Sequence, residues 1–358
     1  MSKLAGTFFM NRQSMNGKIA VVTGAASGIG LEFSRRCVIS YGMTVIMADI
    51  DAAALERETN RLALDLDLDL DLDLEGELGD GNEVREDTDG VFTDGVFTNF
   101  GGDELTDDGN GTAVTNGRGR AIGFRMDVRN RSEYVKLLHV AQTHSNHGDQ
   151  IDVCFLNAGV LGAGVNVLQT GDNNDQHEAD WRWVLDMNLF GVLHGPSVFF
   201  SVLAKQPSPG LLLVTASDRG LDIGGAPGCT AGYATSKHGL IGMCESLEGE
   251  LVKKKLHTKI QLSVLCAGLV ASNLWNVQRA EEQRLDKRQT IANRENQKLL
   301  MEYSGTSVSD TIDTFLEGIQ RGLFICDSVP GQAAESFGRR ADYINEGVLP
   351  SDHRMSML

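Results

Sequence analysis

The chain has 358 residues, 41% of them hydrophobic, which is enough for two average domains or one large domain and excludes a protein that is disordered throughout. The formal net charge is −17, but 17 acidic residues against the single base Arg85 lie between residues 64 and 117. The rest of the chain is almost neutral, so we expect no nucleic-acid partner.

The six cysteines are scattered without a C-x-x-C pair, which argues against a zinc site or a disulfide framework and fits a reducing compartment. The apolar patch "LAGTFFM" near the N-terminus is too short for a signal peptide. No uninterrupted apolar run approaches the roughly 18 residues that a membrane span needs. We therefore expect a soluble, cytoplasmic protein with no membrane partner.

Residues 17–30 read as a buried strand, a glycine-rich turn and the start of a helix. The turn carries Gly24, Gly28 and Gly30 in the spacing T-G-x-x-x-G-x-G. Such a turn lets backbone N–H groups and a helix N-terminus face a pyrophosphate, where a Cβ would block the approach. The alternative is an ordinary strand–loop–helix connection.

A second apolar strand, residues 43–49, ends in Asp49. An acid at this place accepts hydrogen bonds from an adenosine ribose and repels a 2′-phosphate. No Arg or Lys stands in the glycine turn or just after Asp49, which favours NAD over NADP. Alternatively, Asp49 only caps the helix that begins near Ala52.

Residues 52–63 are predicted to be helical, and residues 64–119 form an acidic, low-complexity insertion. The insertion opens with Leu-Asp repeats of period two, which favour a short β ribbon at its start within an otherwise flexible segment. Acidic clusters at 87–90 and 107–111 raise calcium binding as an alternative, but neither fits the spacing of an EF-hand loop.

The fold resumes with a strand over residues 120–128 that ends in Asp127 and Val128, followed by a helix with Tyr134 on its apolar face. Three histidines near the end of that helix lack a carboxylate partner at useful spacing, so we predict no metal site: His139, His144 and His147.

Two further elements each carry a polar group. The strand over residues 151–159 ends in Asn157, Ala158 and Gly159. A helix is predicted over residues 181–195 with Asn188 in its middle, where Asn is unfavourable and needs a reason, either in function or in a bond to a backbone carbonyl of the core.

The strand over residues 210–220 leads to Ser217, and sixteen residues later Tyr233 opens the pair Tyr233-x-x-x-Lys237. Residues four apart share one face of a helix. A free phenol, with a pKa of about 10, is a poor acid–base catalyst near neutrality, and a cation beside it favours the phenolate. The spacing therefore suits proton transfer to or from an oxygen, although alone it is more typical of a plain helix surface.

A further strand, residues 259–272, runs into Gly268, Val270 and Ser272. Strands that alternate with helices in this rhythm predict a Rossmann-like, doubly wound parallel sheet in a single domain. The polar groups named above lie at the carboxyl ends of strands or on the helices that follow, where such sheets bind ligands.

Residues 273–305 are charged and predicted to be helical, and residues 307–326 read as a capped helix followed by the last strand. The tail to Leu358 has no clear pattern.

Taken together, these motifs resemble the short-chain dehydrogenase/reductase family over residues 17–272, apart from the insertion. The resemblance implies a catalytic set of Asn188, Ser217, Tyr233 and Lys237. It also implies these cofactor-binding residues: Gly24, Ser27, Gly28, Ile29, Gly30, Asp49, Asp127, Val128, Asn157, Ala158, Gly159, Tyr233, Lys237, Gly268, Val270 and Ser272. In this family the segment after the sixth strand covers the substrate, and the apolar candidates for that cover are Leu274, Trp275, Val277 and Met301.

The resemblance further implies a function. Tyr233 exchanges a proton with the substrate oxygen, Lys237 supports Tyr233 and holds the nicotinamide ribose, Ser217 bonds the reacting oxygen, and Asn188 holds a relay water. We expect an oxidoreductase that interconverts a secondary alcohol and a ketone or aldehyde with NAD, less favourably NADP, as a homodimer or homotetramer. A non-catalytic dinucleotide-binding scaffold, with the acidic insertion as its partner-binding arm, is the alternative.

The chain departs from the family pattern in three places. The gap between Ser217 and Tyr233 is longer, Ala267-Gly268 replaces the frequent Pro-Gly, and Ser272 stands where Thr is common.

Overall fold

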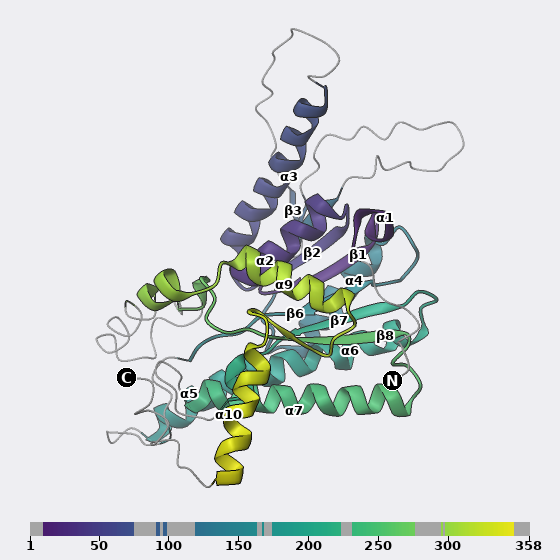
Figure 1. Cartoon of the computed structure of the whole chain (residues 1–358). Helices are drawn as coiled ribbons and strands as arrows, with labels where there is room; N and C mark the ends of the chain where they lie inside the picture. The colour runs from purple at the N-terminus through teal and green to yellow at the C-terminus, as the bar shows by residue number, and fades with distance from the viewer. Residues whose placement is uncertain are drawn as a thin grey trace.

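A central sheet of parallel strands organises the computed structural model of the protein (Figure 1), which describes residues 10–74, 91–93, 96–98, 119–162, 167, 174–222, 231–275, 295 and 298–346. In this part of the chain the parallel strands lie in the order β5-β2-β1-β6-β7-β8-β9. Their bounds are β1 Ile19–Thr23, β2 Thr44–Asp49, β5 Arg120–Arg125, β6 Val153–Leu156, β7 Gly210–Thr215, β8 Ile260–Cys266 and β9 Ile325–Asp327.

The strands are apolar without interruption because both faces of the sheet are covered. In β1, Ile19 and Val21 belong to one core and Ala20 and Val22 to the other. Helices α4, α6 and α7 cover the first core, and α2, α3 and α9 cover the second. The layered α/β fold predicted from the sequence is confirmed.

The helices have the following bounds: α1 Arg12–Met15, α2 Gly28–Arg35, η1 Arg36–Ser40, α3 Ala52–Leu74, α4 Arg131–Thr143, α5 Asn174–Leu185, η2 Asp186–Phe190, α6 Gly191–Lys205, η3 Asp218–Gly220, α7 Ala231–Lys253, η4 Asn273–Trp275, α9 Val308–Gln320 and α10 Gln332–Glu346. The predicted capped helix and last strand are α9 and β9, and the Ser307 side chain accepts a hydrogen bond from the Asp310 N–H at the start of α9. The helix predicted over 181–195 is longer, because α5 and α6 are joined through the π-helical turn η2.

The strand order reverses between β1 and β6, which lie side by side in parallel register. From β1 the chain proceeds outward to β2 and β5, and then returns to β6 on the other side. The connections that follow β1 and β6 therefore leave the sheet in opposite directions. This leaves a crevice between them at the carboxyl ends of the two strands.

The prediction of a β ribbon at the start of the insertion is wrong. Helix α3 continues through the Leu-Asp repeats to Leu74, and the short strands β3 Val91–Thr93 and β4 Val96–Thr98 come later. Extending an established helix adds a hydrogen bond with every residue, whereas a new strand needs a partner. Within this hairpin β3 pairs with β4, and β4 pairs antiparallel with β5, the outermost of the parallel strands. Most of the residues weighed for calcium lie outside the described part of the chain.

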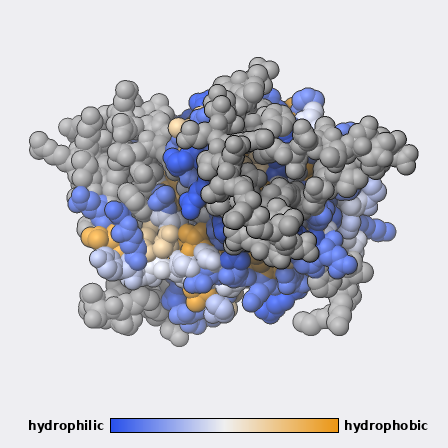
Figure 2. All heavy atoms as spheres, turned by 90° about the horizontal axis from the view of Figure 1, so that it is seen from above, coloured by the Kyte–Doolittle hydropathy of each residue, from blue (hydrophilic) through white to orange (hydrophobic). Residues whose placement is uncertain are grey.

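One described helical run, His177–Lys205, is long and apolar enough in composition to cross a membrane, which the search for uninterrupted apolar runs did not anticipate. Half of its most apolar window is buried inside the protein, as in the core helix of a globular domain. The face of the molecule in Figure 2 is mostly hydrophilic where it is described, with hydrophobic atoms gathered in a few places.

Candidate active site

A cavity lies in the crevice where the strand order reverses, and strand ends on both sides of that point contribute to it. It is lined by all of the predicted cofactor-binding residues except Gly30: Gly24, Ser27, Gly28, Ile29, Asp49, Asp127, Val128, Asn157, Ala158, Gly159, Tyr233, Lys237, Gly268, Val270 and Ser272. The structure therefore brings together residues that are up to 248 positions apart in the sequence.

The glycine turn is packed too tightly for side chains. Gly24 has a φ of +65°, and a Cβ there would lie 2.9 Å from the Cα of Ala158. A Cβ on Gly30 would lie 2.3 Å from the carbonyl oxygen of Gly24, so Gly30 packs beneath the turn. Gly30 does not line the cavity; its small size lets helix α2 approach the turn, and its predicted part in cofactor binding stays a prediction.

Asp49 joins the end of β2 to the glycine turn. Its carboxylate is buried and accepts hydrogen bonds from the N–H groups of Ala26 and Asp51, both at 3.1 Å. The Asp51 carboxylate, and not that of Asp49, bonds the N–H of Ala54 in the first turn of α3. The alternative that Asp49 serves only as the cap of this helix is therefore wrong.

Asn157 ties three strand ends together at the cavity. Its Nδ2 donates to the carbonyl oxygens of Thr23 (3.2 Å) and Gly24 (3.3 Å). Its Oδ1 accepts a hydrogen bond from the Thr215 hydroxyl at 2.9 Å. These contacts link β1, β6 and β7, so the side chain holds in place the strand ends that line the cavity.

Asp127 lies just beyond β5, which ends at Arg125, earlier than the strand predicted to residue 128. Its carboxylate pairs with the Arg129 guanidinium, with Nη2 and Oδ2 2.7 Å apart. Burial alone would raise the pKa of Asp127, but hydrogen bonds from Arg129 and its positive charge outweigh burial and lower it.

Tyr233 and Lys237 both lie in helix α7 and line the cavity. The Lys237 ammonium lies 5.6 Å from the centre of the Tyr233 ring and donates a 2.9 Å hydrogen bond to the carbonyl oxygen of Thr215. Removal from water disfavours its charged form and lowers the pKa of Lys237 to about 8. A lysine so placed can change protonation close to neutral pH.

Asn188 and Ser217 do not line the cavity. Asn188 is fully buried in η2 and bonds both the N–H and the carbonyl oxygen of Val160, each at 2.8 Å. It remains close to the site, because a Cβ on Gly159 would lie 3.1 Å from Asn188 Oδ1 and 3.8 Å from Lys237 Nζ.

The Ser217 hydroxyl donates to Asp218 Oδ1 (3.0 Å) and to the carbonyl oxygen of Ala267 (3.1 Å). It also accepts a hydrogen bond from the N–H of Arg219. The side chain is buried within its own turn, and its role toward the reacting oxygen stays a prediction.

Some lining residues were missed by the sequence motifs. Thr215 ends β7 and Ala216 follows it directly before Ser217, and their place at the strand end was the signal that could have found them. Other residues had no chemical signal, since they contribute apolar surface: Ile50, Met126, Val160, Met187 and Ala267.

Two of the predicted covering residues, Leu274 and Met301, line the cavity. Met301 is buried with Tyr233 and Leu161, and Leu274 packs against them. Trp275 ends the short helix η4, and Val277 lies outside the described residues.

The cradle fits a dinucleotide. It offers a glycine turn without room for side chains, a helix N-terminus at Gly28 and the acid Asp49 at the next strand end. In the described residues, no group of three or more His, Cys, Asp or Glu side chains could hold a metal ion.

The family model for short chain dehydrogenases matches residues 108–283. The chain is 30% identical over 244 residues to short-chain dehydrogenase reductase 3c of Arabidopsis thaliana, and the match covers 68% of each chain. The protein belongs to the short-chain dehydrogenase/reductase family. Another relative, an uncharacterized oxidoreductase of Mycobacterium tuberculosis, is 28% identical over 144 residues, 40% of this chain and about half (48%) of the relative's length.

Solved structures of short-chain dehydrogenases share the fold. A short-chain dehydrogenase/reductase from Burkholderia phymatum, in complex with NAD, has a TM-score of 0.69 at 24% identity and covers 96% of this chain and 98% of its own. A short-chain dehydrogenase from Shigella flexneri, complexed with NADP, has a TM-score of 0.54 at 17% identity and covers 88% of this chain and 98% of its own. The family comprises oxidoreductases that bind NAD(P), and its fold is the one described above.

Proposed function

We propose that this short-chain dehydrogenase/reductase is an NAD-dependent enzyme that interconverts a secondary alcohol and a ketone or aldehyde. The observation that carries the proposal is the shared cavity: Tyr233 and the buried Lys237 line the same space as the glycine turn and Asp49. A site for binding alone has no need of a proton donor beside a buried cation. Asp49, with no arginine among the described lining residues, supports NAD over NADP.

Bound NAD supplies the hydride acceptor, and the chain supplies orientation and proton transfer. The Tyr233 phenolate takes the proton of the alcohol in oxidation, and the resulting hydroxyl returns it to the carbonyl oxygen in reduction. The Lys237 ammonium, 5.6 Å from the Tyr233 ring centre, favours the phenolate. Asn188, next to Lys237, orders the backbone of Val160 at the cavity edge and lies where a relay water could reach the lysine.

The proposed role of Ser217 requires its hydroxyl to change hydrogen-bond partners. Its hydroxyl now bonds Asp218 and the backbone of Ala267, so it must rotate from these partners to bond the reacting oxygen. We propose that substrate binding drives this rotation. Leu274 and Met301 give the cavity an apolar wall beside Tyr233, which favours a small or medium hydrophobic substrate.

Replacing Tyr233 by phenylalanine tests the function because it removes only the hydroxyl. We expect turnover of secondary alcohols with NAD, and of ketones with NADH, to fall by about 10² to 10⁴-fold while the Kd for NADH changes by less than about twofold. Tyr41→Phe is the matched control, since Tyr41 lies at the end of η1 and does not line the cavity.

Unchanged turnover in Tyr233→Phe would contradict the assigned role. A wild-type protein that binds NADH but turns over no alcohol or ketone would favour the scaffold alternative. The homodimer or homotetramer and the cytoplasmic location expected from the sequence stay predictions.

A further inference from the structure

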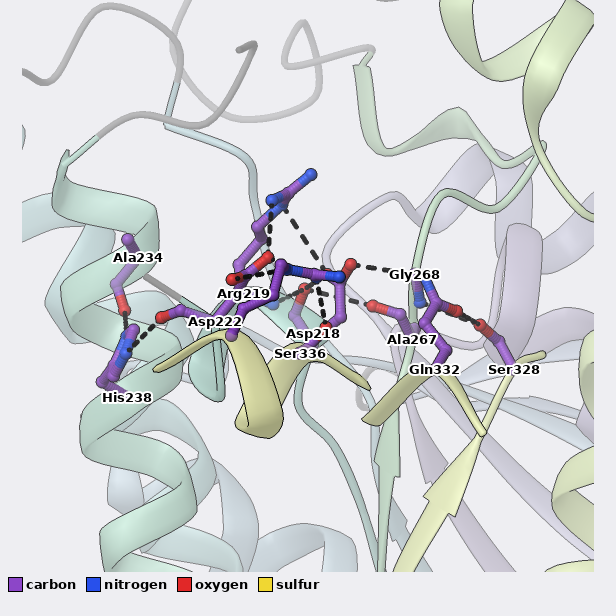
Figure 3. Close-up of polar contacts among 12 residues, drawn as sticks. Asp218, Arg219, Asp222, Ala234, His238, Ala267, Gly268, Ser328, Gln332 and Ser336 are labelled. Carbon is purple, nitrogen blue, oxygen red and sulfur yellow. Dashed lines mark hydrogen bonds and ion pairs between the residues drawn. The ribbon is translucent and has the colours of Figure 1, made fainter. Parts of the chain in front are cut away.

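The C-terminal helix α10, which the sequence did not place, makes polar contacts to the segment that carries Ser217. We call residues 217–222 the serine turn; η3 lies within it. Figure 3 shows side chains of the serine turn, of α7, of the end of β8 and of α10 gathered in one polar cluster. Two members of the turn, Asp218 and Asp222, are carboxylates that are at most 7% exposed.

The serine turn lies between the two parts of the candidate site. The N–H of Asp218 donates to the carbonyl oxygen of Ala267 at 3.0 Å, which fixes the turn to the end of β8. A Cβ on Gly220 would lie 2.7 Å from the carbonyl oxygen of Lys237, so the turn rests directly on the backbone of α7 at the lysine. A displacement of this turn therefore moves Ser217 relative to Tyr233 and Lys237.

Arg339 of α10 holds the turn through Asp222. Its Nη2 lies 2.7 Å from Asp222 Oδ2 and its Nε lies 3.2 Å from Oδ1, a two-pronged contact between guanidinium and carboxylate. Ser336, fully buried on the same helix, accepts a further hydrogen bond from Arg339. Arg219, within the turn itself, contacts Asp222 only at 3.4 Å. Arg339 therefore makes a shorter contact to this buried charge than Arg219 does, and a two-pronged one.

Gln332 makes a second connection at the start of α10. Its Nε2 lies 3.4 Å from Asp218 Oδ2, and its Oε1 accepts from the Ser328 hydroxyl at 3.3 Å. Ser328 in turn accepts a hydrogen bond from the N–H of Gly268. The Gln332 side chain also fills the space beside Gly268, where a Cβ would lie 2.2 Å from its Nε2. Helix α10 thus contacts both the serine turn and a backbone segment that lines the cavity.

We propose that α10 is a positioning element of the active site, in which Arg339, acting through Asp222, holds the serine turn where Ser217 can reach the reacting oxygen. The proposal rests on the proposed function. Without the guanidinium the buried Asp222 carboxylate loses its two-pronged contact, so the turn must shift or admit water. Misplacing a catalytic group by about 1 Å can cost on the order of 100-fold in rate.

The test compares three variants of the full chain. Arg339→Met removes the charge and the two-pronged contact, and Arg339→Lys keeps the charge but not the fork. Glu335→Gln is the control, because Glu335 is 74% exposed and contacts Arg339 from the solvent side. Hydrogen–deuterium exchange of the peptide covering residues 217–222 is measured together with kcat and the Kd for NADH.

We expect Arg339→Met to raise exchange in the serine turn by about tenfold or more, with exchange in β1 unchanged. The kcat of Arg339→Met should fall by about 10 to 100-fold while its Kd for NADH stays within about twofold. The exchange and the kcat of Arg339→Lys should lie between those of Arg339→Met and the wild type. Glu335→Gln should match the wild type in all three measurements. If Arg339→Met does not fold, Arg339→Lys and Gln332→Met are judged by the same criteria.

Unchanged exchange in residues 217–222 would overturn the proposal, whether or not the enzyme turns over. So would raised exchange with unchanged kcat, or exchange raised equally throughout the sheet, which would show that α10 only stabilises the whole fold. Absence of turnover in the wild type is a different failure, since it contradicts the proposed function while the exchange measurement still judges the contact between α10 and the turn.

Discussion

Lys237 combines burial, which costs stability, with a position that the proposed chemistry requires. Its side chain is 4% exposed, and in the described residues its ammonium bonds the carbonyl oxygen of Thr215 without a carboxylate partner of its own in hydrogen-bond reach. A buried cation of this kind disfavours the folded state whenever it is protonated. Such trade-offs between stability and activity are common where a site needs a group in an unfavourable place.

The pH dependence of the free energy of unfolding tests whether the buried Lys237 ammonium destabilises the folded protein. The pKa of Lys237 is about 8 in the folded protein and about 10.5 in the unfolded chain, so the unfolded chain binds more protons between these values. The destabilisation by the buried ammonium is therefore complete below pH 8 and decreases as the pH rises to 10.5. We expect Lys237→Met to stabilise the protein by on the order of 2 kcal/mol at pH 7, and this gain to shrink towards pH 10.5.

Denaturant unfolding of the wild type and the variant across this pH range measures the effect. Lys253→Met at the exposed end of α7 is the control, and its difference from the wild type should not vary with pH. A Lys237→Met protein that is less stable than the wild type at pH 7 would show that the Thr215 hydrogen bond outweighs the cost of burial.

At this scale the sequence predicts which residues meet but not how each side chain points. Asp49 and Asn157 could be placed because each follows an apolar strand, and parallel strand ends converge. The direction of the Ser217 hydroxyl could not, because one of its acceptors is the backbone of Ala267, 50 residues away. Periodicity and spacing carry no information on such a contact. The catalytic and cofactor roles stay predictions.

Among the elements, the π-helical turn η2 positions the Asn188 side chain for its hydrogen bonds. The side chain satisfies the N–H and the carbonyl oxygen of Val160 and bonds the Ser236 hydroxyl of α7 at 3.1 Å. Asn is unfavourable in the middle of a helix, and these contacts supply the structural reason for Asn188. Such π-helical turns are frequent at functional sites.

We expect Asn188→Ala to lower the free energy of unfolding by about 2 kcal/mol, because it removes the hydrogen bonds that Asn188 makes to the N–H and the carbonyl oxygen of the half-buried Val160. Thermal and denaturant unfolding measure the loss. Asp186→Asn, an exposed change in the same turn, should have little effect. A stability loss equal in both variants would mean that the turn, and not the Asn188 contacts, is responsible.

Helices and strands could be predicted where the apolar pattern was strong, as in β1, β2 and β7. The prediction failed where a low-complexity repeat had the period of a different element. The Leu-Asp repeats have the period of a strand, but they follow an amphipathic helix that simply continues. Helix α10 was not predicted, and its contacts to the serine turn are polar, through Gln332 and Arg339.

For the whole molecule, the described strands of the acidic insertion lie at one edge of the sheet. Strand β3 pairs with β4 and β4 pairs with β5, and β5 itself is two strands away from β1. We expect a variant in which a flexible glycine–serine linker replaces residues 75–118 to fold and to bind NADH with a Kd within about twofold of the wild type.

Isothermal calorimetry and circular dichroism check this expectation. A matched variant that replaces only residues 99–118 keeps β3 and β4 and separates the loss of edge strands from the loss of acidic sequence. A folded variant that no longer binds NADH would show that the insertion contributes to the site.

The central claim is that the cavity binds NAD beside Tyr233, and a fluorescence titration with NADH and NADPH, side by side on wild type and Asp49→Ala, tests it most directly. We expect the wild type to prefer NADH and Asp49→Ala to lose that preference, because the carboxylate that repels a 2′-phosphate is gone. A preference for NADPH in the wild type would contradict the role of Asp49. Binding of neither nucleotide would contradict the assignment of the cavity itself.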